Sequence, residues 1–160
     1  MSEQEKKGPA PLQFSTVELK PGHLATQWHC QFPGCSEIIQ VELVARNVAY
    51  PADSSSFDSR DARFFVLQYL QEHERPFSTG IHLLQEDLYP RLEAALRQGD
   101  AGGLLRVSAY YTPFYCKECA SVYCYSHMNY QEVWDEDYII GGVDYWVGKC
   151  PKGHRQFVDH

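Results

Sequence analysis

The sequence predicts an α+β fold in which short antiparallel strands at both ends of the chain flank a two-helix insertion. Three observations lead to this prediction. Apolar and polar residues alternate near the start, the apolar residues of 57–99 recur at helical spacing, and residues 104–160 break into short strand-like runs around glycine and proline. A chain of 160 residues is long enough to bury a core as one domain, predicted over 12–160.

The first part of the chain is predicted to contain a tail and two strands. Residues 1–11 are polar and rich in glycine and proline, as in a disordered tail. Residues 12–19 alternate apolar and polar side chains, as in a half-buried strand, and 37–45 are rich in β-branched residues. Cys30–Cys35 lies between them as a tight loop. Residues 12–45 are therefore predicted to form strands and a first knuckle, which is a tight loop that carries two cysteines.

Residues 57–99 are predicted as a helical insertion. A first helix starts near residue 60, capped by Ser59 or Asp61, and ends at Arg75-Pro76. Pro90 interrupts the second helical segment, 81–98. That segment is either one kinked helix or two helices, the second having Pro90 in its first turn.

Residues 104–160 are predicted as a sheet of short strands. The run LLRVSAYY at 104–111 has the composition of a strand, and further strands are expected around 131–139, 143–149 and 155–158. Two turns containing glycine join the last three.

Eight cysteine and histidine residues stand as four close pairs. The pairs are Cys30 with Cys35, Cys116 with Cys119, Cys124 with His127, and Cys150 with His154. The opening residues lack the apolar stretch of a secretory signal, so we expect a cytoplasmic protein, where cysteines serve metals more often than disulfides. Two short loops that each deliver two ligands suit tetrahedral zinc.

The pairs are predicted to combine into two zinc sites. Cys116 and Cys119 with Cys150 and His154 form the strongest set, because proline and glycine inside the last pair let the backbone turn sharply. The first pair needs partners, and no histidine follows it before residue 73, so Cys124 and His127 are assigned to it. A single zinc, a Cys124 that is merely packed, and His29 as a substitute ligand remain open alternatives.

This interleaved order resembles the ligand logic of RING, B-box and FYVE modules. The spacing from Cys119 to His127 resembles that of B-box and related treble-clef fingers. The resemblance covers ligand spacing and implies a zinc-stabilised sheet of zinc-ribbon or treble-clef type. The long insertion between the first two pairs departs from all of these modules, so no family function is carried over.

Charge and composition point to a protein partner. The net charge is −7 and no basic run is longer than two residues, which argues against nucleic acid, and no apolar run is long enough to span a membrane. Aromatic and acidic residues are interleaved between Lys117 and Lys149, a stretch that contains no other lysine or arginine. We expect them to bind a protein or a basic peptide, and the candidate residues are Trp134, Asp135, Glu136, Asp137 and Tyr138.

The function predicted from these features is that of a zinc-stabilised adaptor. The alternative is a zinc-dependent enzyme acting on a small molecule or peptide, whose zinc would lack one of the eight assigned ligands, because catalytic zinc keeps an open position. Deaminase, zinc protease, P-loop and serine-nucleophile signatures are all absent from the sequence.

Overall fold

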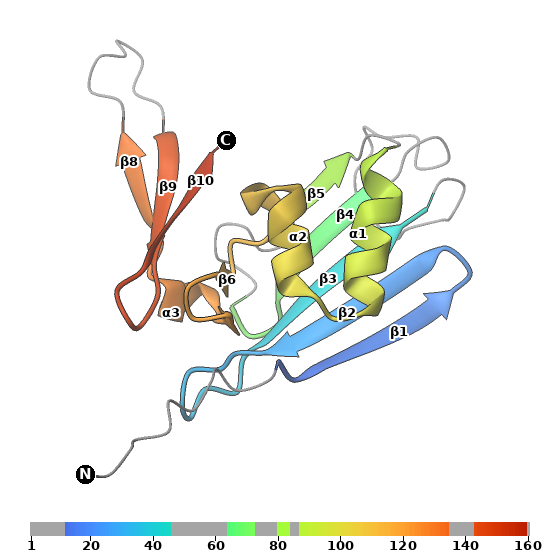
Figure 1. The fold of residues 1–160 in the computed structure, drawn as a ribbon, viewed down its shortest axis with the longest axis horizontal. Coiled ribbons are helices and arrows are strands. Elements are labelled where there is room, and N and C mark those ends of the chain that lie inside the picture. The colour runs from blue at the N-terminus through green and yellow to red at the C-terminus, as the bar shows by residue number, and fades with distance from the viewer. Residues whose placement is uncertain (1–11, 46–63, 73–79, 84–86, 135–142, 160) are drawn as a thin grey trace, which may run out of the picture.

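The computed structural model describes residues 12–45, 64–72, 80–83, 87–134 and 143–159, and its largest element is an antiparallel sheet (Figure 1). Strands that follow each other in the chain are neighbours in the sheet. They are β1 (Phe14–Lys20), β2 (His23–His29), β3 (Ile38–Val44), β4 (Phe64–Tyr69) and β5 (Gly80–Leu83). This simple order needs no crossover connection.

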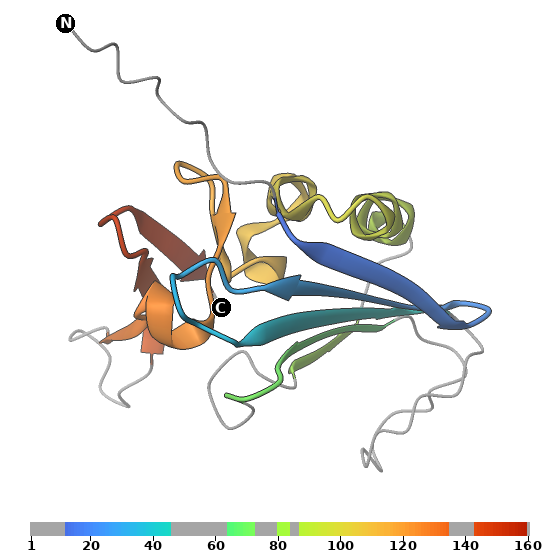
Figure 2. The same ribbon diagram turned by 90° about the horizontal axis from the view of Figure 1, so that it is seen from below.

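Two helices cover one face of this sheet, as the two views in Figures 1 and 2 show. They are α1 (Leu88–Arg97) and α2 (Ala101–Val107). The hydroxyls of Thr16 and Thr26 donate to the carbonyl oxygen of Leu96 at 2.9 and 3.0 Å, and the Trp28 indole donates to Gly99 O at 3.1 Å. The last turn of α1 is thereby fixed to β1 and β2.

The core lies between these helices and the sheet. Strand residues two apart share a face, and the helix-facing set is almost fully buried. It consists of Leu24, Thr26, Trp28, Ile39, Val41, Leu43, Phe65, Leu67 and Tyr69. Leu92, Leu96 and Leu104 are fully buried on the helical side.

The junction between the two helices depends on one glycine. The amide of Asp100 donates to Ala95 O at 2.9 Å, which closes the end of α1, and Gly99 has the left-handed φ of +61° that this cap needs. A Cβ at Gly99 would lie 2.3 Å from the Phe14 ring. Any other residue would therefore clash with β1 as well as strain the backbone.

The C-terminal lobe is built from short elements. In order they are the 3₁₀ helix η1 (Ala109–Tyr111), β6 (Tyr115–Cys116), β7 (Ser121–Val122), α3 (Tyr125–Met128), β8 (Gln131–Trp134), β9 (Val143–Lys149) and β10 (Arg155–Asp159). β6 and β7 form a hairpin, and the last three strands form an antiparallel sheet in the order β10-β9-β8. Figure 1 shows this second sheet beside the larger one.

The α+β class predicted from the sequence is confirmed, but the first predicted helix is wrong where the structure describes it. Phe64–Tyr69 is strand β4, paired with β3 on one side and β5 on the other. A short apolar run fits both helical and strand periods, and pairing on both edges satisfies its backbone as a strand. The predicted caps Ser59 and Asp61 and the predicted end at Arg75-Pro76 lie outside the described residues.

The prediction of a strand at 104–111 is also wrong. That segment is α2 followed by η1, because the Asp100 carboxylate accepts from the amide of Gly103 at 2.8 Å and so caps a helix. Residues 81–98 divide into strand and helix, with Pro90 in the first turn of α1.

Several predicted strands match the structure. The segments 12–19, 37–45, 143–149 and 155–158 correspond to β1, β3, β9 and β10. Strand β2 was not predicted, so the expected N-terminal strand pair is part of a larger sheet. Residues 1–11 and the last part of 131–139 lie outside the described residues. Within the described residues, no helix has the length and apolarity to cross a bilayer.

Candidate metal centres

The first cysteine loop joins β2 to β3 and rests against the C-terminal lobe. The Cys35 amide donates to Phe32 O at 3.0 Å, which closes the loop. The Gln31 amide donates to Val122 O at 2.8 Å, and the Val122 amide donates to Gln31 Oε1 at 2.7 Å. These two hydrogen bonds hold the loop against strand β7.

The short helix α3 brings two further ligand-type side chains to this loop. Cys124 is the N-cap of α3 and His127 lies in its only full turn. Glu72, which follows β4, accepts from the Ser126 amide at 3.2 Å and from the Ser126 hydroxyl. Its carboxylate also lies 3.8 Å from Cys124 Sγ. The start of α3 is thus tied to the large sheet.

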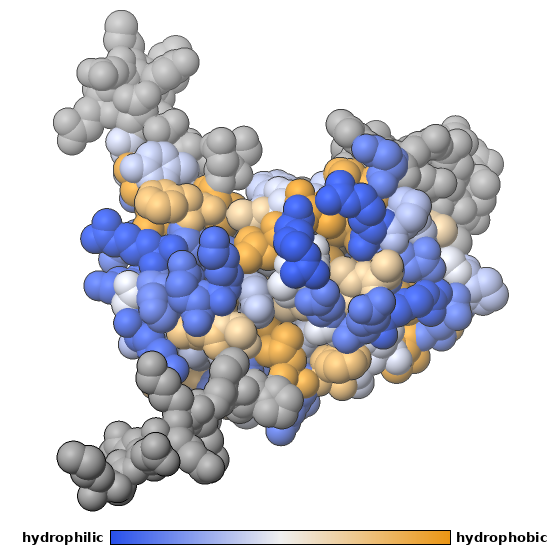
Figure 3. All heavy atoms as spheres, viewed as in Figure 1, coloured by the Kyte–Doolittle hydropathy of each residue, from blue (hydrophilic) through white to orange (hydrophobic). Residues whose placement is uncertain are grey.

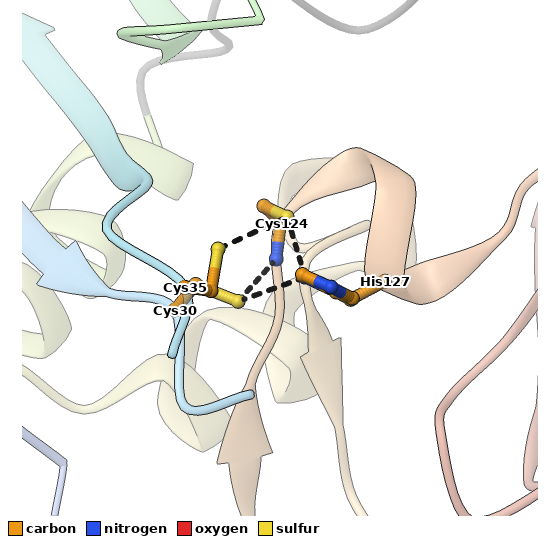
Figure 4. Close-up of side chains that lie close together, drawn as sticks. All are labelled: Cys30, Cys35, Cys124 and His127. Carbon is orange, nitrogen blue, oxygen red and sulfur yellow. Dashed lines mark hydrogen bonds between the residues drawn. The ribbon is translucent and has the colours of Figure 1, made fainter. Parts of the chain in front are cut away.

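We call the group Cys30, Cys35, Cys124 and His127 cluster A (Figure 4). In Figure 4 the two cysteines of the loop point toward the two side chains of α3. Cys35 and Cys124 Sγ atoms are 3.9 Å apart, and His127 Nδ1 lies 3.1 Å from Cys124 Sγ and 3.5 Å from Cys30 Sγ. The Cys124 amide donates to Cys30 Sγ at 3.3 Å.

We call the group Cys116, Cys119, Cys150 and His154 cluster B. The β6–β7 hairpin supplies the first two residues, and the turn between β9 and β10 supplies the others. His154 Nδ1 lies 3.6, 3.2 and 3.3 Å from the sulfurs of Cys116, Cys119 and Cys150, and the last two sulfurs are 3.7 Å apart.

The backbone of cluster B shows why proline and glycine stand between Cys150 and His154. Gly153 has a φ of +91°, and its amide donates to Cys150 O at 2.9 Å. That turn points the His154 amide at Cys150 Sγ, at 3.3 Å. A backbone N–H directed at sulfur stabilises the thiolate that a metal requires.

The spacing in both clusters fits zinc. Bonds of about 2.3 Å to sulfur and 2.0–2.1 Å to nitrogen at tetrahedral angles place two sulfurs about 3.8 Å apart and sulfur about 3.6 Å from nitrogen. The observed sulfur pairs at 3.7 and 3.9 Å and the sulfur–nitrogen distances of 3.1–3.6 Å lie close to these values. A disulfide needs about 2.05 Å, and all six cysteines are free thiols.

The thiols differ in how readily they lose a proton. The hydrogen bond between the side chains of Cys30 and Cys124 lowers the pKa of Cys30 to about 5, although burial acts in the opposite direction. The same hydrogen bond raises the pKa of Cys124. Burial raises the pKa of Cys116 to about 12. For Cys150, burial is outweighed by the amides of His154 and Lys152, and the pKa falls. Within cluster B, Cys116 therefore loses its proton less readily than Cys150 does.

The structure thus brings together the eight side chains in the groups expected from the sequence. His29, the alternative ligand, is exposed at the end of β2 and belongs to neither cluster. The candidate partner surface is described only in part. Trp134 is 54% exposed on β8, whereas Asp135, Glu136, Asp137 and Tyr138 lie outside the described residues.

Other aromatic rings of the C-terminal lobe support its packing. Tyr130 and Trp146 are buried, and the half-buried Tyr125 stacks on Tyr130 with ring centres 6.0 Å apart. On the outer face of the second sheet, Tyr145 lies beside the exposed Phe157, with ring centres 6.0 Å apart. The sequence gives little signal for this face, because 155–158 is two polar residues followed by two apolar ones rather than an alternating run.

Comparison with known proteins gives one match. Residues 66–160 match the model of a family described as a domain of unknown function (DUF8328). The match contains all of cluster B and the α3 half of cluster A. No curated protein and no solved structure matches the chain.

Proposed function

The chain belongs to this family of unknown function, and from the geometry of its two clusters we propose that it is a zinc-stabilised protein-interaction module. Each cluster holds one zinc ion in this proposal. The observation that carries it is that each group offers four ligand atoms within 4.8 Å of one another. Zinc with three thiolates and one imidazole is a common structural site, and thiolate ligands suit a reducing compartment such as the cytoplasm.

The ligand number favours a structural role over catalysis. A catalytic zinc has three protein ligands and a water, whereas each cluster offers four side chains, enough to fill a tetrahedron around one ion. The enzyme alternative requires one side chain to leave its cluster. No distance in either group singles out such a side chain.

Zinc at these positions would tie together segments far apart in the chain. Cluster A joins the β2–β3 loop to α3, and cluster B joins the β6–β7 hairpin to the β9–β10 turn. The β6–β7 hairpin has only two residues in each strand, and a two-stranded hairpin is at best marginally stable on its own in water. The surface of the lobe therefore depends on metal in this proposal.

The adaptor role is supported by an exposed aromatic side chain. Trp134 is 54% exposed at the end of an edge strand, and tryptophan is among the side chains that most often anchor a protein interface. Its neighbours Asp135, Glu136 and Asp137 favour a basic protein or peptide. Their part in binding stays a prediction from the sequence.

The test of the zinc proposal is metal content and coordination. Protein purified without chelators should contain two zincs per chain, and X-ray absorption at the zinc edge should give on average three sulfur ligands at about 2.3 Å and one nitrogen. A zinc with a bound water in place of one side chain would support the enzyme instead. Protein that folds fully with no bound metal would contradict the proposal.

The interaction part is tested separately. Affinity capture with wild-type protein and with Trp134→Ala, compared by mass spectrometry, should yield partners that only the wild type retains. Both proteins must contain two zincs and melt at the same temperature. A partner set that does not change with Trp134→Ala would remove this residue from the interface.

A further inference from the structure

Among the described residues, strand β10 is an edge strand whose outer backbone edge is unpaired, while its Gln156 side chain donates to Thr112 O at 2.9 Å. It pairs with β9 through residues Arg155–Asp159, and β9 pairs with β8 beyond it. Among the described residues, no backbone hydrogen bond joins the other side of β10 to a neighbouring segment. An unpaired edge of this kind is a template for an added strand.

A cavity of about 430 Å³ lies along this edge. On one side it is lined by β10, and on the other by Leu105, Arg106 and Ala109 from α2 and η1. Lys117 and Glu118 of the β6–β7 hairpin close one end, next to cluster B. Figure 3 shows hydrophobic residues, in orange, in the zone between the second sheet and the helices, with hydrophilic residues on either side.

A second hollow of about 450 Å³ lies on the outer face of the same sheet. Val133, Tyr145 and Val147 form its apolar part, and Arg155 and Phe157 border both hollows. Side chains of a strand point alternately to opposite faces. A strand added beside β10 would therefore send successive side chains toward one hollow and then the other.

The charged side chains around the two hollows are mostly positive, although Cys116 and His154 of cluster B also line the first hollow and a zinc ion with three thiolates would add one net negative charge there. Arg106, Lys117 and Arg155 line the first hollow, where Glu118 is the one acidic residue among the lining residues. Lys149 and Arg155 line the second, which has no acidic lining residue. Arg106 donates to Asp100 at 2.9 Å, but its side chain is 73% exposed. Lys117 and Arg155 form no ion pair with any residue that the structure describes.

We propose that an acidic segment of another protein binds along β10 in extended conformation and adds a strand to the second sheet. Backbone hydrogen bonds to the β10 edge supply affinity, apolar side chains of the segment enter the first hollow, polar side chains face the second, and its carboxylates pair with Lys117 and Arg155. An edge cation by itself also prevents aggregation of strands. It does not account for a hollow with a mostly apolar lining that lies along the same edge.

This inference rests on the proposed function, because cluster B fixes the β9–β10 turn and the β6–β7 hairpin that frame the groove. The β10 surface is separate from the surface around Trp134. The segment proposed to bind at β10 is acidic, whereas the partner expected at Trp134 is basic.

The experiment is a selection of random linear peptides displayed on phage against full-length protein whose zinc content has been measured. The expected peptides carry more Asp and Glu than Lys and Arg. In a nitrogen-15 NMR titration, the best peptide should shift the amides of β10 and of Leu105 and Ala109. Methylating its backbone nitrogens one at a time should weaken binding at alternate positions, because only every second N–H of an added strand faces β10.

Two charge reversals test the contacts. Arg155→Glu and Lys117→Glu should each weaken the selected peptide by about tenfold, as for the loss of one hydrogen bond to a charged group. Arg91→Glu on the exposed side of α1 is the matched control and should leave the affinity unchanged. All three variants should keep two zincs.

Several results would overturn the proposal. They are selection of no peptide or of basic peptides, NMR shifts centred away from β10, equal effects of methylation at all positions, or full affinity in Arg155→Glu. If the protein contains two zincs and any of these occurs, this inference fails alone. If the protein holds no zinc but still binds acidic peptides at β10, the zinc proposal fails and the strand addition stands.

Discussion

Replacing His127 by alanine should release the Cys30–Cys35 loop from the C-terminal lobe while cluster B keeps its metal. With zinc bound, the loop is held by a site worth on the order of 10 kcal/mol, so it should open only when the whole protein unfolds. Without zinc, a weak hydrogen bond from the Cys124 amide to Cys30 Sγ remains, together with the two stronger hydrogen bonds between Gln31 and Val122. At about 1 kcal/mol each, the two stronger bonds give an opening free energy of about 2 kcal/mol, or a protection factor near 30.

The assay is amide hydrogen exchange at Gln31 and Val122, the two donors of these bonds. In the wild type, both amides should exchange only through global unfolding, whose free energy is about 5–15 kcal/mol in ordinary domains. In His127→Ala both should exchange with a protection factor of about 30, while amides of β3 remain protected.

Phe32→Ala is the control for this variant. The Phe32 ring stacks on the His127 ring with centres 3.9 Å apart, so the control removes the ring contact but none of the ligands. It should keep its zinc and its protection at Gln31. If His127→Ala protects Gln31 as well as the wild type does, metal in cluster A is not what holds the loop, and the reasoning is refuted.

Further predictions concern single residues. Trp134→Ala should change the free energy of unfolding by less than about 0.5 kcal/mol, since the ring is 54% exposed, and thermal melting checks this; a much larger loss would place the ring in the core. Gly99→Ala should destabilise by at least about 2 kcal/mol, measured by urea unfolding, because the new methyl meets the Phe14 ring and the backbone φ is +61°. Ala120→Gly should stabilise by up to about 1 kcal/mol in the same assay, because Ala120 has a φ of +49°. Zinc affinity should fall as the pH is lowered, because protons compete with zinc for the thiolates, and Cys116, whose pKa burial raises to about 12, must lose its proton to bind. Calorimetry in buffers of different ionisation enthalpy should detect this proton release. A zinc affinity that does not depend on pH would contradict the prediction.

The grouping of the eight candidate ligands could be predicted because the information is local. Each knuckle places two ligand-type residues within five positions, and Pro151 and Gly153 mark the turn that aims one of them. The unpaired Cys30 and Cys35 then left Cys124 and His127 as the available partners. Ligand chemistry, rather than the surrounding fold, determines which side chains gather.

The wrong elements depended on information that is not local. Phe65, Leu67 and Tyr69 form one face of a strand, yet the same run has enough apolar residues for a helical face. Only the presence of β3 and β5 on its two edges decides for the strand. Likewise, the strand-like run at 104–111 becomes helical because Asp100, just upstream, caps it and the sheet buries Leu104. The groove beside β10 was not predictable, because it is formed by segments about 50 positions apart.

The most direct test of the central claim, two interleaved zinc sites, is the zinc content of a set of ligand variants. Wild type should contain two zincs, and Cys30→Ser, His127→Ala and their double variant should each contain one, because both residues belong to cluster A. Combining Cys30→Ser with Cys150→Ser should leave none. If the Cys30 and His127 double variant instead loses both zincs while each single variant keeps one, the two residues serve different ions and the interleaved arrangement is contradicted.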